Sequence, residues 1–197
     1  MKTKNIAPDL SEFEDFGAEI LAYVQFARLK NLYRQGWLQS GVDEELCETV
    51  AEHSLGVVLL TVLYGMQKEN EGFDLKKAML MALFHDFGEI YAGDFTPSDP
   101  VSAEMKHNLE RDAVERVFDG LAEKGYILSL WQEYESGSSI EAQFVKELDR
   151  LEMGLQAAVY KGSGILAQPE GFINTMKRDV QNPELSTAVR QIEDLCK

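Results

Sequence analysis

Apolar residues recur at helical spacing along most of this chain, and this pattern constrains the fold more than any other feature. In the segment 48–69 the apolar line includes Val50, Val57, Leu60 and Tyr64. No segment alternates apolar and polar residues strongly enough to build a β-sheet. We therefore predict an all-α fold, a helical bundle.

Residues that commonly cap helices mark where the predicted helices begin. Ser11-x-x-Glu14 and Ser138-x-x-Glu141 have the form of capping boxes, and Asp74 is suited to cap a helix that is apolar on nearly every side. The predicted helices cover residues 11–34, 48–69, 74–88, 102–124 and 138–160, with a weakly amphipathic tail after them. Because the helix from residue 74 is apolar all round, we expect it at the centre of the bundle.

Length and charge limit what the chain can bind. Its 197 residues suit one domain, which we take to span 1–197. With 34 acidic and 19 basic residues the formal net charge is -15, which opposes binding to a nucleic-acid polymer. A small anionic substrate is still compatible, since a few cations and a metal ion can dominate the field in one pocket.

Cysteine content and hydropathy indicate the compartment. Cys47 and Cys196 form no CxxC pair, so the chain has neither a disulfide framework nor a thiolate zinc motif. The N-terminus turns acidic where a signal peptide would be apolar, and the longest apolar-rich run, Leu55 to Met66, is too short to span a bilayer. We expect a cytoplasmic protein with no membrane partner.

Two of the three histidines lie on the apolar faces of predicted helices. His53 shares its line with Val50 and Val57, while His85-Asp86 ends the apolar run AMLMALF. A buried carboxylate or imidazole needs a partner, because burying it alone is costly. Taken singly, a histidine on an apolar face is more often a hydrogen-bonded core residue than a metal ligand.

The predicted helix 138–160 carries two acids on or beside its apolar line, Asp149 and Glu152. Together with the two histidines and Asp86 they form a mixed nitrogen and oxygen set that suits a divalent transition metal, and facing helices of a bundle can bring such residues together. We predict that His53, His85, Asp86 and Asp149 bind a metal between central helices, with Glu152 orienting a ligand from behind.

These residues resemble the H…HD…D signature of the HD-domain metal-dependent phosphohydrolases. The segments around these residues are similar to those of the 5'-deoxynucleotidase group and come in the same order: RLKNLYRQGW, AEHS, HDFGEIYAGDFTP, WQEYESGSSIEAQFVKELDRLEM and QAAVY. The resemblance covers about residues 29–160 and leaves 161–197 as a C-terminal helical extension. It implies a single HD-type domain that hydrolyses deoxyribonucleoside 5'-monophosphates to a deoxynucleoside and phosphate.

The resemblance also implies roles for further residues. Glu89 matches the general acid/base, with Asp94 as its partner or a further metal contact, while Arg34 and Trp37 match contacts to the phosphate and the deoxyribose. The metal is one divalent ion, Mn, Co, Mg, Zn, Fe or Ni, with room for a second near Glu89 and Asp94. Relatives commonly form homodimers.

Several alternatives stay open. An HD-type phosphodiesterase would use additional histidines, and the remaining His107 lies on a polar helix, while a dNTP triphosphohydrolase would carry more basic residues near the motif. A non-catalytic bundle that keeps a metal for stability is a third possibility. We expect Lys106 to lie on a solvated helix face with Glu110, and the stretch 131–135 to serve packing and surface.

Overall fold

Residues 1–5, 7–68 and 72–197 are described by a computed structural model of the chain. The longer helices are α1 (Ala18–Phe26), α3 (Val50–Gly65), α4 (Leu75–Phe84), α6 (Ala103–Val117), α7 (Lys124–Ser136), α8 (Ile140–Gly162), α9 (Glu170–Asp179) and α10 (Ser186–Leu195). The shorter ones are α2 (Gln35–Gln39), α5 (Glu89–Ala92) and the 3-10 helices η1 (Leu10–Phe13) and η3 (Pro183–Leu185). Across these ranges the backbone forms two isolated β-bridges and no strand, so the all-α prediction is confirmed.

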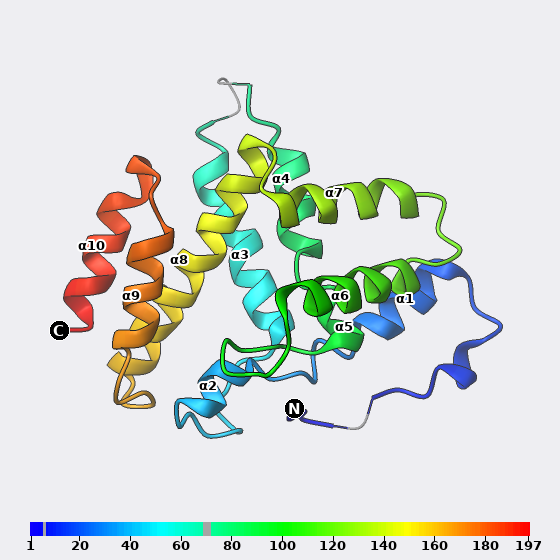
Figure 1. Ribbon diagram of the computed structural model, residues 1–197, viewed down its shortest axis with the longest axis horizontal. Helices are drawn as coiled ribbons and strands as arrows, with labels where there is room; N and C mark the ends of the chain where they lie inside the picture. The colour runs from blue at the N-terminus through cyan, green and yellow to red at the C-terminus, as the bar shows by residue number, and fades with distance from the viewer. Residues whose placement is uncertain (6, 69–71) are drawn as a thin grey trace.

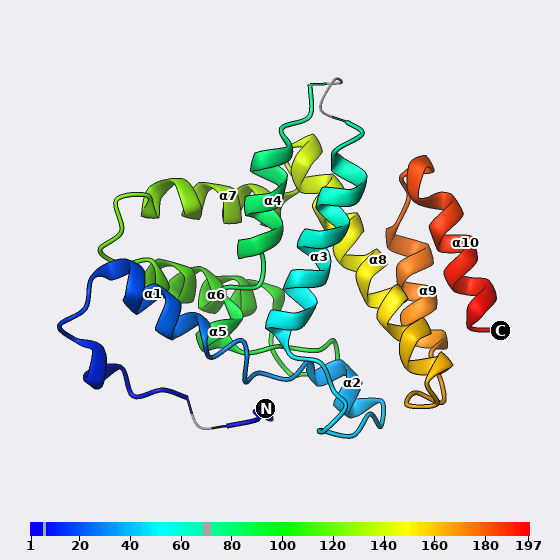
Figure 2. The same cartoon turned by 180° about the vertical axis from the view of Figure 1, so that it is seen from behind.

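Helices α3, α4 and α8 form the middle of the molecule (Figures 1 and 2). Helices α9 and α10 pack on one side of them, along α8, and α1, α5 and α6 lie on the other side. Helix α4, which the sequence places at the centre, packs against α3, α7 and α8. No helix in the described ranges is long and apolar enough to cross a membrane.

The apolar core consists of two clusters of buried side chains. The first joins α3, α4, α8 and the C-terminal helices through residues that include Val57, Ala82, Leu148, Leu151, Met176 and Ile192. The second joins α3, α6 and α7 through residues that include Leu29, Val50, Phe87, Val114, Val117 and Trp131. Residues beyond 160 thus share the first cluster with the central helices.

The predicted ligands lie where these clusters meet. On α3, His53 lies between Val50 of the second cluster and Val57 of the first. His85 likewise follows Ala82 of the first cluster and precedes Phe87 of the second. Apolar packing on both sides therefore holds these polar groups in the interior.

The predicted helix 11–34 is wrong as one continuous element. Asp9 caps η1, and its Oδ1 accepts both the backbone N–H and the hydroxyl of Ser11, 3.0 and 2.9 Å away. The Ser11 hydroxyl is therefore a donor to Asp9 instead of an acceptor for the helix. Gly17 then precedes α1, which ends at Phe26.

The other predicted helix ends are partly right. Asp74 caps α4 and Ser102 caps α6, as expected. Helix α8 is capped by Ser139, one residue after the predicted Ser138. Helix α6 ends at Val117, before the predicted end at Lys124, and Lys124 is instead the first residue of α7. The helix predicted over 74–88 stops at Phe84, and a turn with the HD pair separates it from α5.

Candidate metal centre

His53 is positioned by the first turn of α3. Thr49 caps this helix in a capping box with Glu52, so the helix begins just ahead of the histidine. The His53 ring is 1% exposed, and its Nδ1 lies 2.6 Å from Oε2 of Glu152 on α8. Since a carboxylate accepts the hydrogen at Nδ1, the ring directs Nε2 away from Glu152.

His85 is positioned by the end of α4. Its Nδ1 lies 2.8 Å from the carbonyl oxygen of Ala82, in the last turn of that helix. Because a carbonyl can only accept, Nδ1 carries the hydrogen and Nε2 offers its lone pair. The prediction that Glu152 orients a ligand agrees with its bond to His53, and for His85 a backbone carbonyl does the same.

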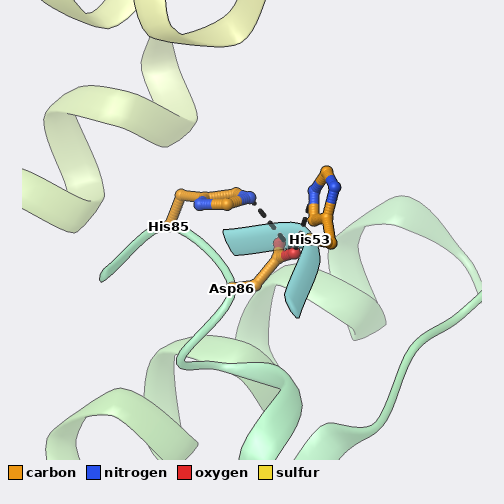
Figure 3. A group of neighbouring side chains, drawn as sticks. All are labelled: His53, His85 and Asp86. Carbon is orange, nitrogen blue, oxygen red and sulfur yellow. Dashed lines mark ion pairs between the residues drawn. The ribbon is translucent and has the colours of Figure 1, made fainter. Parts of the chain in front are cut away.

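Three of the four predicted ligands form one compact group (Figure 3). Oδ2 of Asp86 lies 3.1 Å from Nε2 of His85 and 3.6 Å from Nε2 of His53. The fourth, Asp149 on α8, has its Oδ1 3.2 Å from Nε2 of His53. The structure therefore brings together all four residues, from α3, from the turn after α4 and from α8.

The free atoms of this group fit a cation. Nε2 of His53, Nε2 of His85 and Oδ2 of Asp86 are buried and have no hydrogen-bond partner among the described residues. Leaving such atoms unpaired in the interior costs free energy. A divalent ion satisfies all of them at once, and two imidazoles with carboxylates are a donor set that Mn, Fe, Co, Ni and Zn accept.

The charges around these atoms also favour a bound cation. Burial opposes a proton on His53, yet the carboxylates of Asp149 and Glu152 beside its two ring nitrogens outweigh burial and raise its pKa to about 10. Burial would also raise the pKa of Asp149, but the charge of Arg150 and the nearby imidazole of His53 hold that pKa well below its usual value. The centre thus concentrates ionised carboxylates that attract positive charge.

Glu89 begins α5 and is 4% exposed, and its Oε2 has no hydrogen-bond partner in the described part of the chain. Burial, followed by the charges of Asp86 and Asp94, holds its pKa well above the usual glutamate value. A carboxyl group with a raised pKa keeps its proton to a higher pH, which is the property needed of a proton donor.

Arg34 links two of the predicted acids. Its Nη1 lies 3.4 Å from Oδ1 of Asp94 and 3.8 Å from Oδ2 of Asp86. Asp94 is fixed further by the backbone N–H of Gln35, which donates to its Oδ2 at 2.5 Å. The start of α2 and the loop after α5 are therefore tied together beside the metal centre.

Trp37 is more deeply buried than we expect of a residue that contacts the deoxyribose of a substrate. Its side chain is 2% exposed and packs against Tyr160, at right angles, and Phe172, with ring centroids 5.3 and 4.0 Å away. Its Nε1 donates to Oε1 of Glu48 at 2.7 Å. Trp37 is thus connected to the candidate metal centre by its hydrogen bond to Glu48, which lies beside His53 and Glu152. Burial, followed by the charge of Glu152, raises the pKa of Glu48 to about 7. Sequence reasoning missed Glu48, because no apolar pattern marks it.

The prediction that residues 131–135 serve only packing and surface is wrong for Tyr134. Its ring lies 5.4 Å from the ring of His85, and its hydroxyl donates to Oδ2 of Asp149 at 3.3 Å. Trp131 is buried packing, as expected. The helical spacing from Leu130 to Tyr134 was the available signal, because it places both side chains on one inward face of α7.

Lys106 and Glu110 are a pair, 3.4 Å apart, but the predicted solvated face is wrong for Glu110, which is 7% exposed. A Cβ on Gly88 would lie 2.6 Å from Cβ of Glu110, so this face of α6 is packed against the start of α5. Burial lowers the pKa of Lys106, but the charge of Glu110, followed by those of Glu89 and Asp86, outweighs burial and raises that pKa. His107, by contrast, is exposed as predicted.

Comparisons with known proteins identify the family of this chain. A family profile described as "HD domain" matches residues 26–192. A 5'-deoxynucleotidase of Danio rerio is 37% identical over 173 residues, 85% of this chain and 82% of that protein. A 5'-deoxynucleotidase of Homo sapiens is 31% identical over 190 residues, 92% of this chain and 88% of that protein.

Solved structures extend the similarity. A protein of Pyrococcus horikoshii is 32% identical, with a TM-score of 0.75 over 89% of this chain and 99% of its own. A predicted metal-dependent phosphohydrolase of Magnetospirillum magnetotacticum is 28% identical, with a TM-score of 0.67 over 90% of this chain and 92% of its own. The family implies a divalent metal, and the buried histidine and aspartate group supplies ligands for it. The chain belongs to the HD-domain family, in its 5'-deoxynucleotidase group.

Proposed function

We propose that this protein is a metal-dependent phosphomonoesterase that hydrolyses deoxyribonucleoside 5'-monophosphates to a deoxynucleoside and inorganic phosphate. The observation that carries this function is the buried group of His53, His85 and Asp86, with unpaired atoms directed at one another. The relatives named 5'-deoxynucleotidases, which align over most of the chain, support the substrate class.

His53, His85, Asp86 and Asp149 would hold one divalent ion, which we propose to be Mn, Co, Mg, Zn, Fe or Ni. A second ion near Glu89 and Asp94 is part of the same proposal, supported by the unpartnered Oε2 of Glu89. When bound, such an ion supplies Lewis-acid chemistry at a phosphate oxygen and activates water.

Arg34 would orient the phosphate. Its guanidinium, held by Asp94 at 3.4 Å, offers a planar fork of donors that matches phosphate oxygens. Because Asp94 also accepts the N–H of Gln35, the fork is held in place before substrate binds. A preorganised donor loses less entropy on binding than a mobile one.

Glu89 would supply the proton that the leaving group needs. Hydrolysis forms a bond from water oxygen to phosphorus and breaks the bond from phosphorus to the 5'-oxygen, which must take up a proton. The raised pKa of Glu89 keeps a proton available at this position, and Asp94 acts as its charged partner.

A contact between Trp37 and the deoxyribose stays a prediction. The ring lies just after Arg34 in α2 but is covered by Tyr160 and by the half-buried Phe172. A sugar would therefore reach it only where Phe172 moves aside.

We also propose a cytoplasmic homodimer. Cys47 and Cys196 are both free, as in proteins of reducing compartments. For the dimer, the support is an exposed apolar stripe on α3, where Leu55, Leu59 and Leu63 are 69%, 56% and 55% exposed. Contiguous exposed apolar surface of this kind commonly marks an interaction site.

The reaction is tested by measuring phosphate release from dNMPs, NMPs, dNTPs and cyclic nucleotides. The protein is stripped of metal and then supplied in turn with Mn, Co, Mg, Zn, Ni or Fe. We expect release from dNMPs and little from NMPs. Release only from cyclic nucleotides or dNTPs would instead identify a phosphodiesterase or a triphosphohydrolase, and no release at all would favour the non-catalytic bundle.

The variant Glu89→Gln tests the proton donor. It keeps the size of the side chain but removes the proton that is transferred, so we expect kcat to fall about 10²–10⁴-fold while the ion held by the two histidines, Asp86 and Asp149 stays bound. Equal kcat in the variant and the parent protein would remove Glu89 from the reaction.

A further inference from the structure

Glu48 is a half-buried carboxylate on the segment before α3 that the proposed reaction does not use. Three contacts hold it. Its backbone N–H donates to the hydroxyl of Tyr160 at 2.8 Å, its carbonyl accepts the backbone N–H of Arg34 at 3.1 Å, and its Oε1 accepts Nε1–H of Trp37 at 2.7 Å. Holding a flexible glutamate side chain in one position costs conformational entropy, which the hydrogen bond from Trp37 helps to offset.

The carboxylate of Glu48 lies behind the metal centre. An oxygen of Glu48, an oxygen of Glu152 and a ring nitrogen of His53 all lie within 4.8 Å of one another. Glu152 takes the hydrogen of His53 Nδ1 at 2.6 Å, on the side of the ring opposite to Nε2. Two carboxylates from separate segments therefore lie beside one imidazole.

Carboxylates in this position act on the metal through the ring. A carboxylate that accepts the hydrogen of the remote nitrogen orients the imidazole and makes the other nitrogen a stronger ligand. A second negative charge nearby adds to this effect in the low dielectric of the interior. Glu48 also lies beside Glu152 and so restricts where that side chain can move.

We infer that Glu48 is a positioning residue for the metal centre: acting with Glu152 it strengthens cation binding at Nε2 of His53, and Trp37 sets the direction of its carboxylate. The function of the Trp37 indole is then to donate to Glu48. This inference rests on the proposed role of His53 as a ligand, but not on hydrolysis of any nucleotide.

The test is a titration of the metal-stripped protein with Co²⁺, followed by the visible absorption of the bound ion. Glu48→Gln preserves the size of the side chain and an oxygen that can accept from Trp37, but removes the charge. We expect Co²⁺ to bind about 10-fold more weakly, the lower end of the loss found when such outer partners are replaced. Glu45→Gln, an exposed acid of the same loop, makes the same change in net charge and should bind as the parent does.

A Glu48→Gln protein that is folded and binds Co²⁺ within about twofold of the parent would overturn the inference, since it would leave Glu48 with only the structural role of holding Trp37. The titration does not depend on turnover, so it stands even where the nucleotide screen fails. Trp37→Phe provides a second reading, because it removes the indole N–H while keeping an aromatic ring. We expect weaker Co²⁺ binding by Trp37→Phe; Co²⁺ binding as tight as that of the parent would show that the hydrogen bond from Trp37 does not set the carboxylate of Glu48.

Discussion

Glu110 shows how burial changes the chemistry of a single residue in this protein. Its side chain is 9% exposed and lies 3.4 Å from the ammonium of Lys106. Burial has the largest effect and raises its pKa to about 7, although the charge of Lys106 opposes the rise. The unfolded chain releases the same proton near the ordinary glutamate value of about 4.3.

This difference predicts a loss of stability as the pH rises. Between about pH 4.5 and 7 the folded state binds more protons at Glu110 than the unfolded state, so the free energy of unfolding falls over that range. A tenfold difference in proton affinity between the two states corresponds to about 1.4 kcal/mol, so the loss is on the order of 1–3 kcal/mol. We expect Glu110→Gln to lose less stability than the parent between pH 5 and 8.

Urea unfolding at pH 5 and pH 8 measures this effect. Glu115→Gln is the matched control, since Glu115 is on the same helix with its side chain 50% exposed. If Glu110→Gln and the control show the same pH dependence, burial of Glu110 does not have the predicted effect.

At the scale of elements, the contact between α3 and α8 determines the geometry behind His53. Gly56 lies on α3 opposite Glu152, and a Cβ there would come within 2.6 Å of Oε1 and 3.0 Å of Cγ of Glu152. The absence of a side chain at Gly56 is therefore what allows Glu152 to reach His53.

We expect Gly56→Ala to weaken metal binding by displacing Glu152. In a helix interior this substitution normally gains about 1 kcal/mol of stability, so a loss would identify the steric contact as dominant. Gly125→Ala on α7, where no atom lies within 4 Å of the added Cβ, is the control and should keep the parent's metal affinity. Metal affinity is measured by titration and stability by thermal unfolding for both variants. Metal binding by Gly56→Ala that is as tight as the parent's, or tighter, would show that the added Cβ does not displace Glu152.

The helix predictions failed where local hydrogen bonds competed with helix formation. Ser11 donates to Asp9, so its capping pattern did not start the long helix. The chain leaves α4 after Phe84, at the HD pair, and the ring of His85 then lies 5.4 Å from the ring of His53 on α3. Periodicity predicts that a segment is helical, but it does not fix which turn ends the helix.

At the scale of the whole molecule, the exposed stripe on α3 predicts a dimer. Leu55, Leu59 and Leu63 recur every four residues along α3 with exposed fractions of 69%, 56% and 55%, and α3 lies on the viewer's side of α8 in Figure 2. A twofold axis through such a stripe would pair it with its own copy and remove its apolar surface from water.

We expect Leu59→Glu to convert the dimer to a monomer, because it places a charge in the middle of that interface. Light scattering after size exclusion measures the mass against twice the 22.2 kDa of one chain. Leu195→Glu, at an exposed leucine of α10 that is 71% exposed, is the control. A parent protein that is already monomeric would contradict the homodimer, and a Leu59→Glu dimer would place its interface elsewhere.

Much of this protein was predictable from the order of its residues. Helical spacing identified the fold class, and histidines on apolar lines identified His53 and His85 as metal-centre candidates, because a buried imidazole needs a partner. The sequence motifs around Asp86 and Asp149 then indicated the family. Each of these inferences uses information local to one segment.

Only the tertiary structure decided which groups surround those candidates. Glu48 and Tyr134 meet His53 and His85 across separate segments, and Glu110 turns inward because α6 packs against the start of α5. Periodicity states which face of a helix is apolar but not which residues of another helix lie opposite. The charge, burial and hydrogen bonding of a polar group depend on those opposite residues, and therefore on the packing of the whole chain.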